Sequence, residues 1–302
     1  MAGGISSEAQ PEPSGRSAAV NALREKSVVR EGYGVHTGAP ARVVLEPRRT
    51  GGMWLCASGE RAPLADLSVA STSRATTVEA GGGRLRVATI EHALAALAGL
   101  AHYEGLAIHV EGPEMPLLGG GAREWCDALG EIDLPTASSP PMRITRRAVL
   151  RAGASTYEFN PGDAIDIAVR IDFGDTRLAP EAAWDGDPRD FRARIAPART
   201  FAFERDLDEL ARSGLARHVA PEAVVVITPR AILSAGEPFA EDEPARHKLL
   251  DLLGDLYLHG GVPLGSIRAV RPGHAANARV FAQARAEGVL VPAHLRAPGD
   301  PA

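Results

Sequence analysis

The stretch Glu243-Pro-Ala-Arg-His-Lys-Leu-Leu-Asp-Leu-Leu-Gly-Asp-Leu-Tyr-Leu-His259 decides how this chain folds. Its leucines cover most of a helix circumference, which predicts a buried helix from Pro244 to His259. His247, Asp251 and Asp255 follow one another at i, i+4 and i+8, and this spacing places all three on one face. Because unpaired ionisable groups are costly to bury, that face needs a partner.

A metal ion is one such partner. A histidine and an aspartate one turn apart, here His247 and Asp251, can hold a divalent ion, with Asp255 as a supporting carboxylate. The alternative is a simple His–Asp helix pair with Asp255 in solvent. A third ligand would favour the metal, and His92 is the candidate. It lies in the short helix predicted over Thr89–Gly99, whose threonine is expected to cap the start and whose glycine ends it.

Two further residues could perform acid–base chemistry at such a metal. Glu91, next to His92, suits a general base; the alternative is a first-turn glutamate stabilised by the helix dipole beside a core histidine. His274 follows a Pro-Gly turn and opens a helix predicted over 275–286. It suits a general acid whose protonated form Asp255 would favour; the alternative is a polar helix-terminal residue.

The segment Ala198-Arg-Thr-Phe-Ala-Phe203 adds a hydroxyl and a ring. Thr200 could polarise a carbonyl beside a metal, and Phe201 could lie against a sugar. An ordinary strand of alternating large residues explains the segment equally well.

Composition excludes several functions. The formal net charge is −5 and aromatics make up 5%, which argues against a nucleic-acid partner. We find no apolar run long enough to span a bilayer and no secretory signal, so we expect a cytoplasmic chain without a transmembrane segment, and a monomer. Cys56 and Cys126 form no Cys-x-x-Cys pair, so a metal must be bound by histidine and carboxylate.

Proline and glycine divide the chain. Residues 135–142 contain three prolines and predict a linker between two domains, 23–134 and 143–302, after a flexible tail over 1–22. Strands cluster between few helices in each half, which predicts an α+β fold and not a doubly wound parallel sheet. Further expected elements are strands at 28–29, 41–47, 106–110, 143–151, 156–160 and 164–172, a buried strand at 223–228, and a helix at 206–213.

Four motifs occur in one order: Thr89-Ile-Glu-His92, Arg199-Thr-Phe201, His247-Lys-x-x-Asp251 with Gly254-Asp255, and Gly273-His-Ala-x-Asn277. Tyr33-Gly-Val-His-Thr-Gly38 and Pro113-Glu-Met-Pro-Leu117 are weaker additions. Over residues 27 to 290 the set resembles the zinc-dependent UDP-3-O-acyl-N-acetylglucosamine deacetylases of lipid A biosynthesis.

The resemblance implies two α+β sandwich domains with the active site between them. It implies Zn²⁺ held by His92, His247 and Asp251. The substrate would be an acylated UDP-sugar, hydrolysed to acetate and the free amine.

The resemblance also implies a role for each remaining group. Glu91 would be the general base, Thr200 would stabilise the oxyanion, and His274, oriented by Asp255, would be the general acid. Lys248 and Phe201 would help to hold the substrate.

The chain departs from the family pattern in three places. Leu118-Gly-Gly-Gly121 stands where the family has Asp-Gly-Ser, and Ala216–Ala223 replaces a Gly-Gly-Ser-x-Asp-Asn run beside the acyl passage. A lysine expected before Tyr157 is missing. Three alternatives therefore stay open: a zinc deacetylase of a different acetylated amino sugar, a non-catalytic nucleotide-sugar binding protein of the same fold, and a structural metal site.

Overall fold

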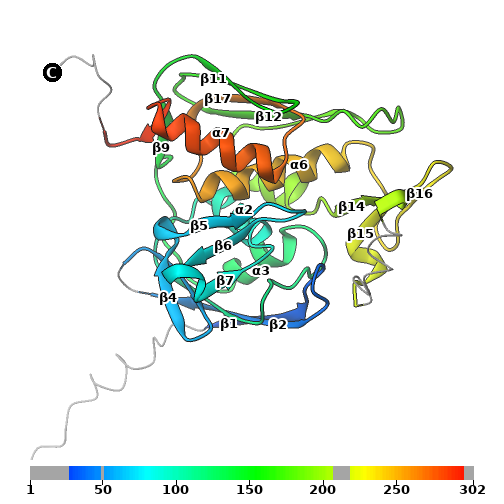
Figure 1. Cartoon of the computed structure of the whole chain (residues 1–302), viewed down its shortest axis with the longest axis horizontal. Helices are drawn as coiled ribbons and strands as arrows, with labels where there is room; N and C mark the ends of the chain where they lie inside the picture. Colours follow the sequence, from blue (N-terminus) through cyan, green and yellow to red (C-terminus); the bar gives the residue numbers. More distant parts are fainter. Residues whose placement is uncertain (1–26, 49–50, 207–217, 296–302) are drawn as a thin grey trace, which may run out of the picture.

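The computed structural model describes residues 27–48, 51–206 and 218–295. The tail predicted over 1–22, and the helix predicted over 206–213 beyond its first residue, lie outside these ranges. The described chain forms four layers, in which helices lie between two sheets (Figure 1).

The first half builds a five-stranded sheet in the order β1-β2-β8-β3-β4. Strand β3 runs parallel to β8, while β1, β2 and β4 pair antiparallel with their neighbours. A separate three-stranded sheet, β5-β6-β7, leads into helix α2. The elements are β1 Val28–Tyr33, β2 Pro40–Pro47, β3 Met53–Ala57, β4 Glu60–Pro63, β5 Ser68–Ser71, β6 Thr77–Ala80, β7 Leu85–Val87, β8 Leu106–Glu111, α2 Glu91–Gly99 and α3 Arg123–Gly130.

The second half builds a seven-stranded sheet whose main path is β10-β11-β17-β12-β13, with β9 paired to β17 and β18 paired to β9. Strands β12 and β17 are parallel and most other pairs are antiparallel, so the α+β prediction is confirmed. The elements are β9 Met142–Ile144, β10 Ala148–Ala152, β11 Ser155–Asn160, β12 Ile165–Arg170, β13 Glu181–Trp184, α4 Pro188–Asp190, α6 Glu243–Tyr257, β17 Pro263–Val270, α7 His274–Ala286 and β18 Leu290–Pro292.

A fourth sheet stands apart from these layers. It consists of β14 Thr200–Phe203, β15 Val224–Ile227 and β16 Ile232–Leu233, with β14 and β15 parallel (Figure 1). Val225 and Ile227 pack with Leu178 in a small apolar cluster of their own. The buried apolar side chains of this sheet thus form a cluster separate from the main core.

Helices α2 and α6 meet in the main core, which draws residues from both halves of the chain. Gly254 of α6 lies against the backbone of Glu91, and a Cβ at residue 254 would overlap the Glu91 carbonyl oxygen. Glycine is thus required for this close approach. No helix or strand occupies 135–141; the domain boundaries themselves stay a prediction.

Two local predictions are wrong. Thr89 does not cap α2: its φ is +56°, residue Ile90 takes the cap position, and the Thr89 hydroxyl donates to Glu114 instead. The strand at 223–228 is buried on one face only. A continuous apolar sequence is expected both for a strand that is buried on its two faces and for one whose second face lines a cavity, so the sequence could not tell these cases apart.

Candidate active site

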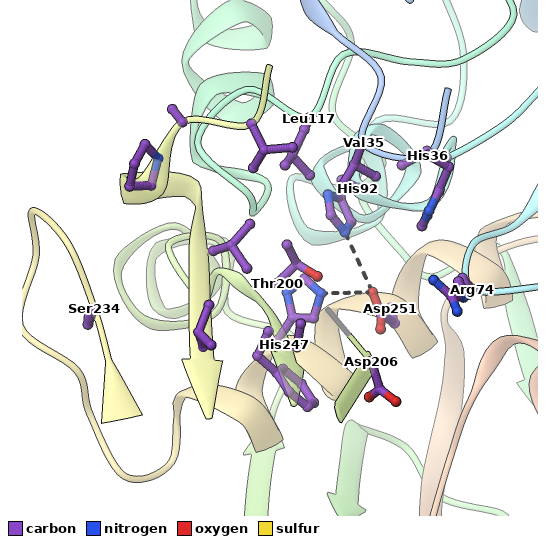
Figure 2. A pocket seen from close by; sticks show the side chains of 18 of the residues that line it. Val35, His36, Arg74, His92, Leu117, Thr200, Asp206, Ser234, His247 and Asp251 are labelled. Atoms are coloured by element: carbon purple, nitrogen blue, oxygen red, sulfur yellow. Dashed lines mark ion pairs between the residues drawn. The ribbon is translucent and has the colours of Figure 1, made fainter. Parts of the chain in front are cut away.

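Three side chains converge where α2 meets α6. His92, His247 and Asp251 each offer a ligand atom within 4.8 Å of the others, and all three are buried. Asp251 Oδ1 lies 3.7 Å from His92 Nε2 and 3.5 Å from His247 Nε2, along the dashed lines in Figure 2. The three residues that the sequence singles out as ligands are thus brought together.

The donor set fits a divalent metal ion. Asp251 Oδ1 is buried and accepts no hydrogen bond within the part of the chain that the structure describes. Orphaned buried carboxylate oxygens are rare, and a cation that also reaches both Nε2 atoms would satisfy this one. The other oxygen, Oδ2, accepts a hydrogen bond from Lys248 Nζ at 2.7 Å.

His247 is held in the form that a ligand needs. Its Nδ1 lies 3.0 Å from the carbonyl oxygen of Ala198, which can only accept, so Nδ1 carries the proton and Nε2 keeps its lone pair. Burial lowers the pKa of His247 to about 4, against the opposing charge of Asp251. The imidazole is therefore neutral at physiological pH.

Glu91 lies beside this cluster without belonging to it. Its Oε2 accepts the backbone N–H of Thr76 at 3.1 Å, and its Oε1 lies 3.7 Å from His274 Nε2. Burial raises the pKa of Glu91, against the charges of His274 and His92. A carboxylate with a raised pKa is a better proton acceptor near neutral pH.

His274, the first residue of α7, faces Asp255 of α6. Its Nδ1 lies 2.9 Å from Asp255 Oδ2, and the same oxygen accepts Asn277 Nδ2 at 2.8 Å. Burial opposes the charged imidazole, but the carboxylates of Asp255, Glu91 and Asp251 together outweigh it and raise the pKa of His274 to about 10. His274 is thus protonated while His247 is neutral.

Thr200 and Phe201 of β14 reach the same cavity, and Lys248 Nζ lies 5.6 Å from the Phe201 ring centre. Their neighbour Arg199 is buried and forms two hydrogen bonds with the carboxylate of Glu243, the first residue of α6. This ion pair joins β14 to the start of the helix that carries His247.

A cavity of about 1010 Å³ opens over these residues. One wall holds the polar groups, with His36 and Arg74 at its edge (Figure 2). The opposite wall belongs to the fourth sheet and to the segment just before β15. It is apolar and consists of Val219, Pro221, Val224, Val226 and Ile232. The cavity therefore suits a ligand with one polar and one apolar part.

The Leu118–Gly121 segment packs the two halves against each other. The carbonyl oxygen of Gly120 accepts the backbone N–H of Thr200 at 2.8 Å. Gly120 has a φ of +84°, and a Cβ there would overlap the Ala223 carbonyl oxygen. This glycine run thus positions Thr200.

Several residues were missed by the sequence analysis. Thr76 contacts Glu91, Asp255 and His274. Glu114 accepts hydrogen bonds from the backbone of His36 and Thr37 and from the hydroxyls of Thr37 and Thr89. A lone threonine carries no sequence signal. Glu114 lies in the Pro113–Leu117 motif, so the sequence marked this residue but did not indicate what its side chain does.

A buried His–His–Asp set with a carboxylate and a charged histidine beside it is the arrangement of a metal-dependent hydrolase. Residues 22–285 match the family model described as LpxC, UDP-3-O-acyl N-acetylglycosamine deacetylase. The chain belongs to this family, which is a family of metalloenzymes.

Individual relatives agree. A UDP-3-O-acyl-N-acetylglucosamine deacetylase of Anaeromyxobacter dehalogenans is 32% identical over 258 residues, 83% of each chain. One of Myxococcus xanthus is 31% identical over 88% of this chain and 87% of the relative, and one of Brucella ovis is 33% identical over 83% and 90%. The resemblance of the ordered motifs is confirmed, and the chain is an enzyme, a deacetylase. Within the described ranges, no helix has the length and apolar character to cross a membrane.

Proposed function

We propose that this chain hydrolyses the N-acetyl group of UDP-3-O-acyl-N-acetylglucosamine, releasing acetate, in lipid A biosynthesis. The observation that carries the site assignment is Asp251 Oδ1, buried without a hydrogen bond among the described residues and facing two histidine Nε2 atoms. We assign the metal as Zn²⁺, bound by His92, His247 and Asp251. When bound there, zinc would polarise the acetyl carbonyl and lower the pKa of water.

Glu91 and His274 divide the proton transfers between them. Glu91 accepts the proton of the attacking water, for which its raised pKa suits it. His274 donates the proton at Nε2 to the leaving amine nitrogen, while Nδ1 stays hydrogen-bonded to Asp255. An amine is a poor leaving group until it is protonated, so a histidine held in its charged form meets the need of this step.

Three further side chains act on the substrate. The Thr200 hydroxyl stabilises the developing oxyanion, and the Phe201 ring supports the sugar. Lys248 supplies a positive charge for the nucleotide sugar.

The apolar wall of the cavity supports an acylated substrate. Val224 and Val226 of β15 face the cavity and Ile232 of β16 continues the surface, so an acyl chain leaving the sugar would find apolar side chains. All the groups named come from one chain, and we propose that it acts as a monomer. Because its substrate is a nucleotide sugar, we place the reaction in the cytoplasm.

The test is an acetate-release assay with zinc-loaded protein on three substrates: UDP-3-O-acyl-N-acetylglucosamine, UDP-N-acetylglucosamine and free N-acetylglucosamine. We expect turnover of the first alone. Glu91→Gln, which keeps the shape of the side chain, should retain zinc and lose about 10²- to 10⁴-fold in kcat. Equal turnover of a free N-acetyl sugar, or an active metal-free preparation, would contradict the proposal.

A further inference from the structure

Thr76 lies where the base and the acid of the proposed reaction meet. Its backbone N–H donates to Glu91 Oε2 at 3.1 Å, and its hydroxyl donates to Asp255 Oδ1 at 2.5 Å. The same hydroxyl lies 3.2 Å from His274 Nδ1. The residue is 2% exposed, so water does not compete for these contacts.

Thr76 is placed between the helices by β6, a strand of the separate β5-β6-β7 sheet. Thr76 immediately precedes β6, and its carbonyl oxygen accepts the backbone N–H of Ile90, the residue before α2, at 3.4 Å. Its side chain meets α6 at Asp255 and α7 at His274. One residue thus joins the three helices that carry the ligands, the base and the acid.

The hydrogen bonds at Asp255 show what the hydroxyl does. Oδ2 already accepts from His274 and Asn277, and the Asn277 Oδ1 in turn accepts the Tyr157 hydroxyl at 2.5 Å, which fixes the orientation of the amide. The other oxygen, Oδ1, accepts its hydrogen bond from the Thr76 hydroxyl. Since the hydroxyl donates its proton to Asp255, its lone pairs are free to act as a second, longer acceptor for the His274 Nδ1–H, which donates mainly to Asp255 Oδ2. The hydroxyl therefore locks the carboxylate plane and the imidazole ring together.

We propose that Thr76 is a positioning residue of the deacetylase reaction: its hydroxyl orients Asp255 and His274 while its N–H orients Glu91. The inference rests on the proposed function for the reaction itself. Thr76 does not line the cavity, so it acts through these side chains and not on the substrate.

Thr76→Val removes the hydroxyl and keeps the shape, and Thr76→Ser keeps the hydroxyl. Thr77→Val is the matched control, because Thr77 is the next residue, half-buried, in register with Ser71 of β5. We expect Thr76→Val to lose about 10- to 100-fold in kcat, as removal of a hydrogen bond to a charged group implies, with KM and zinc content unchanged. Thr76→Ser should recover most of kcat, and Thr77→Val should match the wild type.

A second measurement does not depend on activity. In metal-free protein the downfield ¹H resonance of the His274 Nδ1–H, identified by its loss in His274→Gln, should shift or broaden in Thr76→Val and stay in place in Thr76→Ser and Thr77→Val. Wild-type kcat in Thr76→Val, an equal loss in Thr76→Ser, or loss of zinc would overturn the positioning role. An inactive wild type would instead count against the proposed function.

Discussion

Gly254 of α6 lies directly against the backbone carbonyl of Glu91 in α2. The residue after Glu91 is His92, and the residue three positions before Gly254 is Asp251. The distance between two metal-ligand candidates on different helices is thus set by a backbone contact that only glycine allows.

Gly254→Ala should push α2 and α6 apart. Overpacking of this kind costs about 1–3 kcal/mol in the free energy of unfolding, and it should also weaken metal binding because His92 moves away from Asp251. Urea denaturation and zinc titration measure the two effects. Gly52→Ala is the control, because nothing lies within 4 Å of a Cβ at that position. If Gly254→Ala is destabilised but binds zinc with unchanged affinity, the helix contact does not set the distance between the ligands, and the prediction is wrong.

Asp251→Asn should abolish tight zinc binding, whereas Asp255→Asn should not. Asp251 Oδ1 faces both histidines, while both Asp255 oxygens accept hydrogen bonds. We expect Asp251→Asn to lower zinc affinity by more than about 100-fold. This loss exceeds the one expected for a residue that only hydrogen-bonds to a metal ligand. Asp255→Asn should keep the zinc and lose kcat. Elemental analysis after dialysis against a chelator checks this; zinc retained by Asp251→Asn would refute the ligand assignment.

The pKa values of the two buried histidines should be shifted in opposite directions in metal-free protein. Because burial lowers the pKa of His247 to about 4 and three carboxylates raise that of His274 to about 10, at pH 7 the first is neutral and the second charged. A folded pKa above the unfolded value of about 6.5 makes the His274 contribution to stability full below pH 6.5 and lost as pH rises toward 10. Side-chain ¹⁵N NMR assigns both charges, and His274→Gln should flatten the alkaline loss of stability.

Glu114→Gln should destabilise the turn over residues 33–38. Burial favours the neutral acid, but hydroxyl donors from Thr89 and Thr37 and the N–H groups of His36 and Thr37 outweigh it and lower the pKa of Glu114. An amide places its own donors against these donors, which should cost about 1–3 kcal/mol. The difference should be full above about pH 5 and shrink as pH falls through the lowered pKa.

Urea denaturation of Glu114→Gln at pH 7 and pH 4 measures this cost. Glu111→Gln is the control, because its ion pair with Arg42 is exposed and should be worth less than about 1 kcal/mol. Equal stability of the two variants would show that the buried carboxylate does not hold the turn.

Much of the fold could be predicted from periodicity and breakers. The apolar circumference of 244–259 indicated the buried helix, and the structure begins it at Glu243 and ends it at Tyr257. The side-chain cap assigned to Thr89 was wrong because a tertiary partner, Glu114, takes its hydroxyl. Such a partner lies outside any local window of sequence.

The site divides in the same way. Helical spacing was sufficient to place His247, Asp251 and Asp255 on one face. His92, Glu91 and His274 were candidates from their positions near helix starts, and the ordered motifs then supported them. Thr76 was beyond reach, because its role comes from three contacts made across the fold by a residue with no motif. The roles assigned to the site residues remain predictions that the variants above will test.

The separate packing of the fourth sheet has a consequence for substrate range. Val225 and Ile227 pack in a small cluster separate from the main core, while Val224 and Val226 on the other face line the cavity. We therefore expect that side chains on the cavity face, Val224 and Val226, can be exchanged with little effect on the helices that hold the histidines and carboxylates. Substitutions on this face, whether natural or engineered, could change the length of acyl chain that the cavity accepts while leaving the catalytic groups in place.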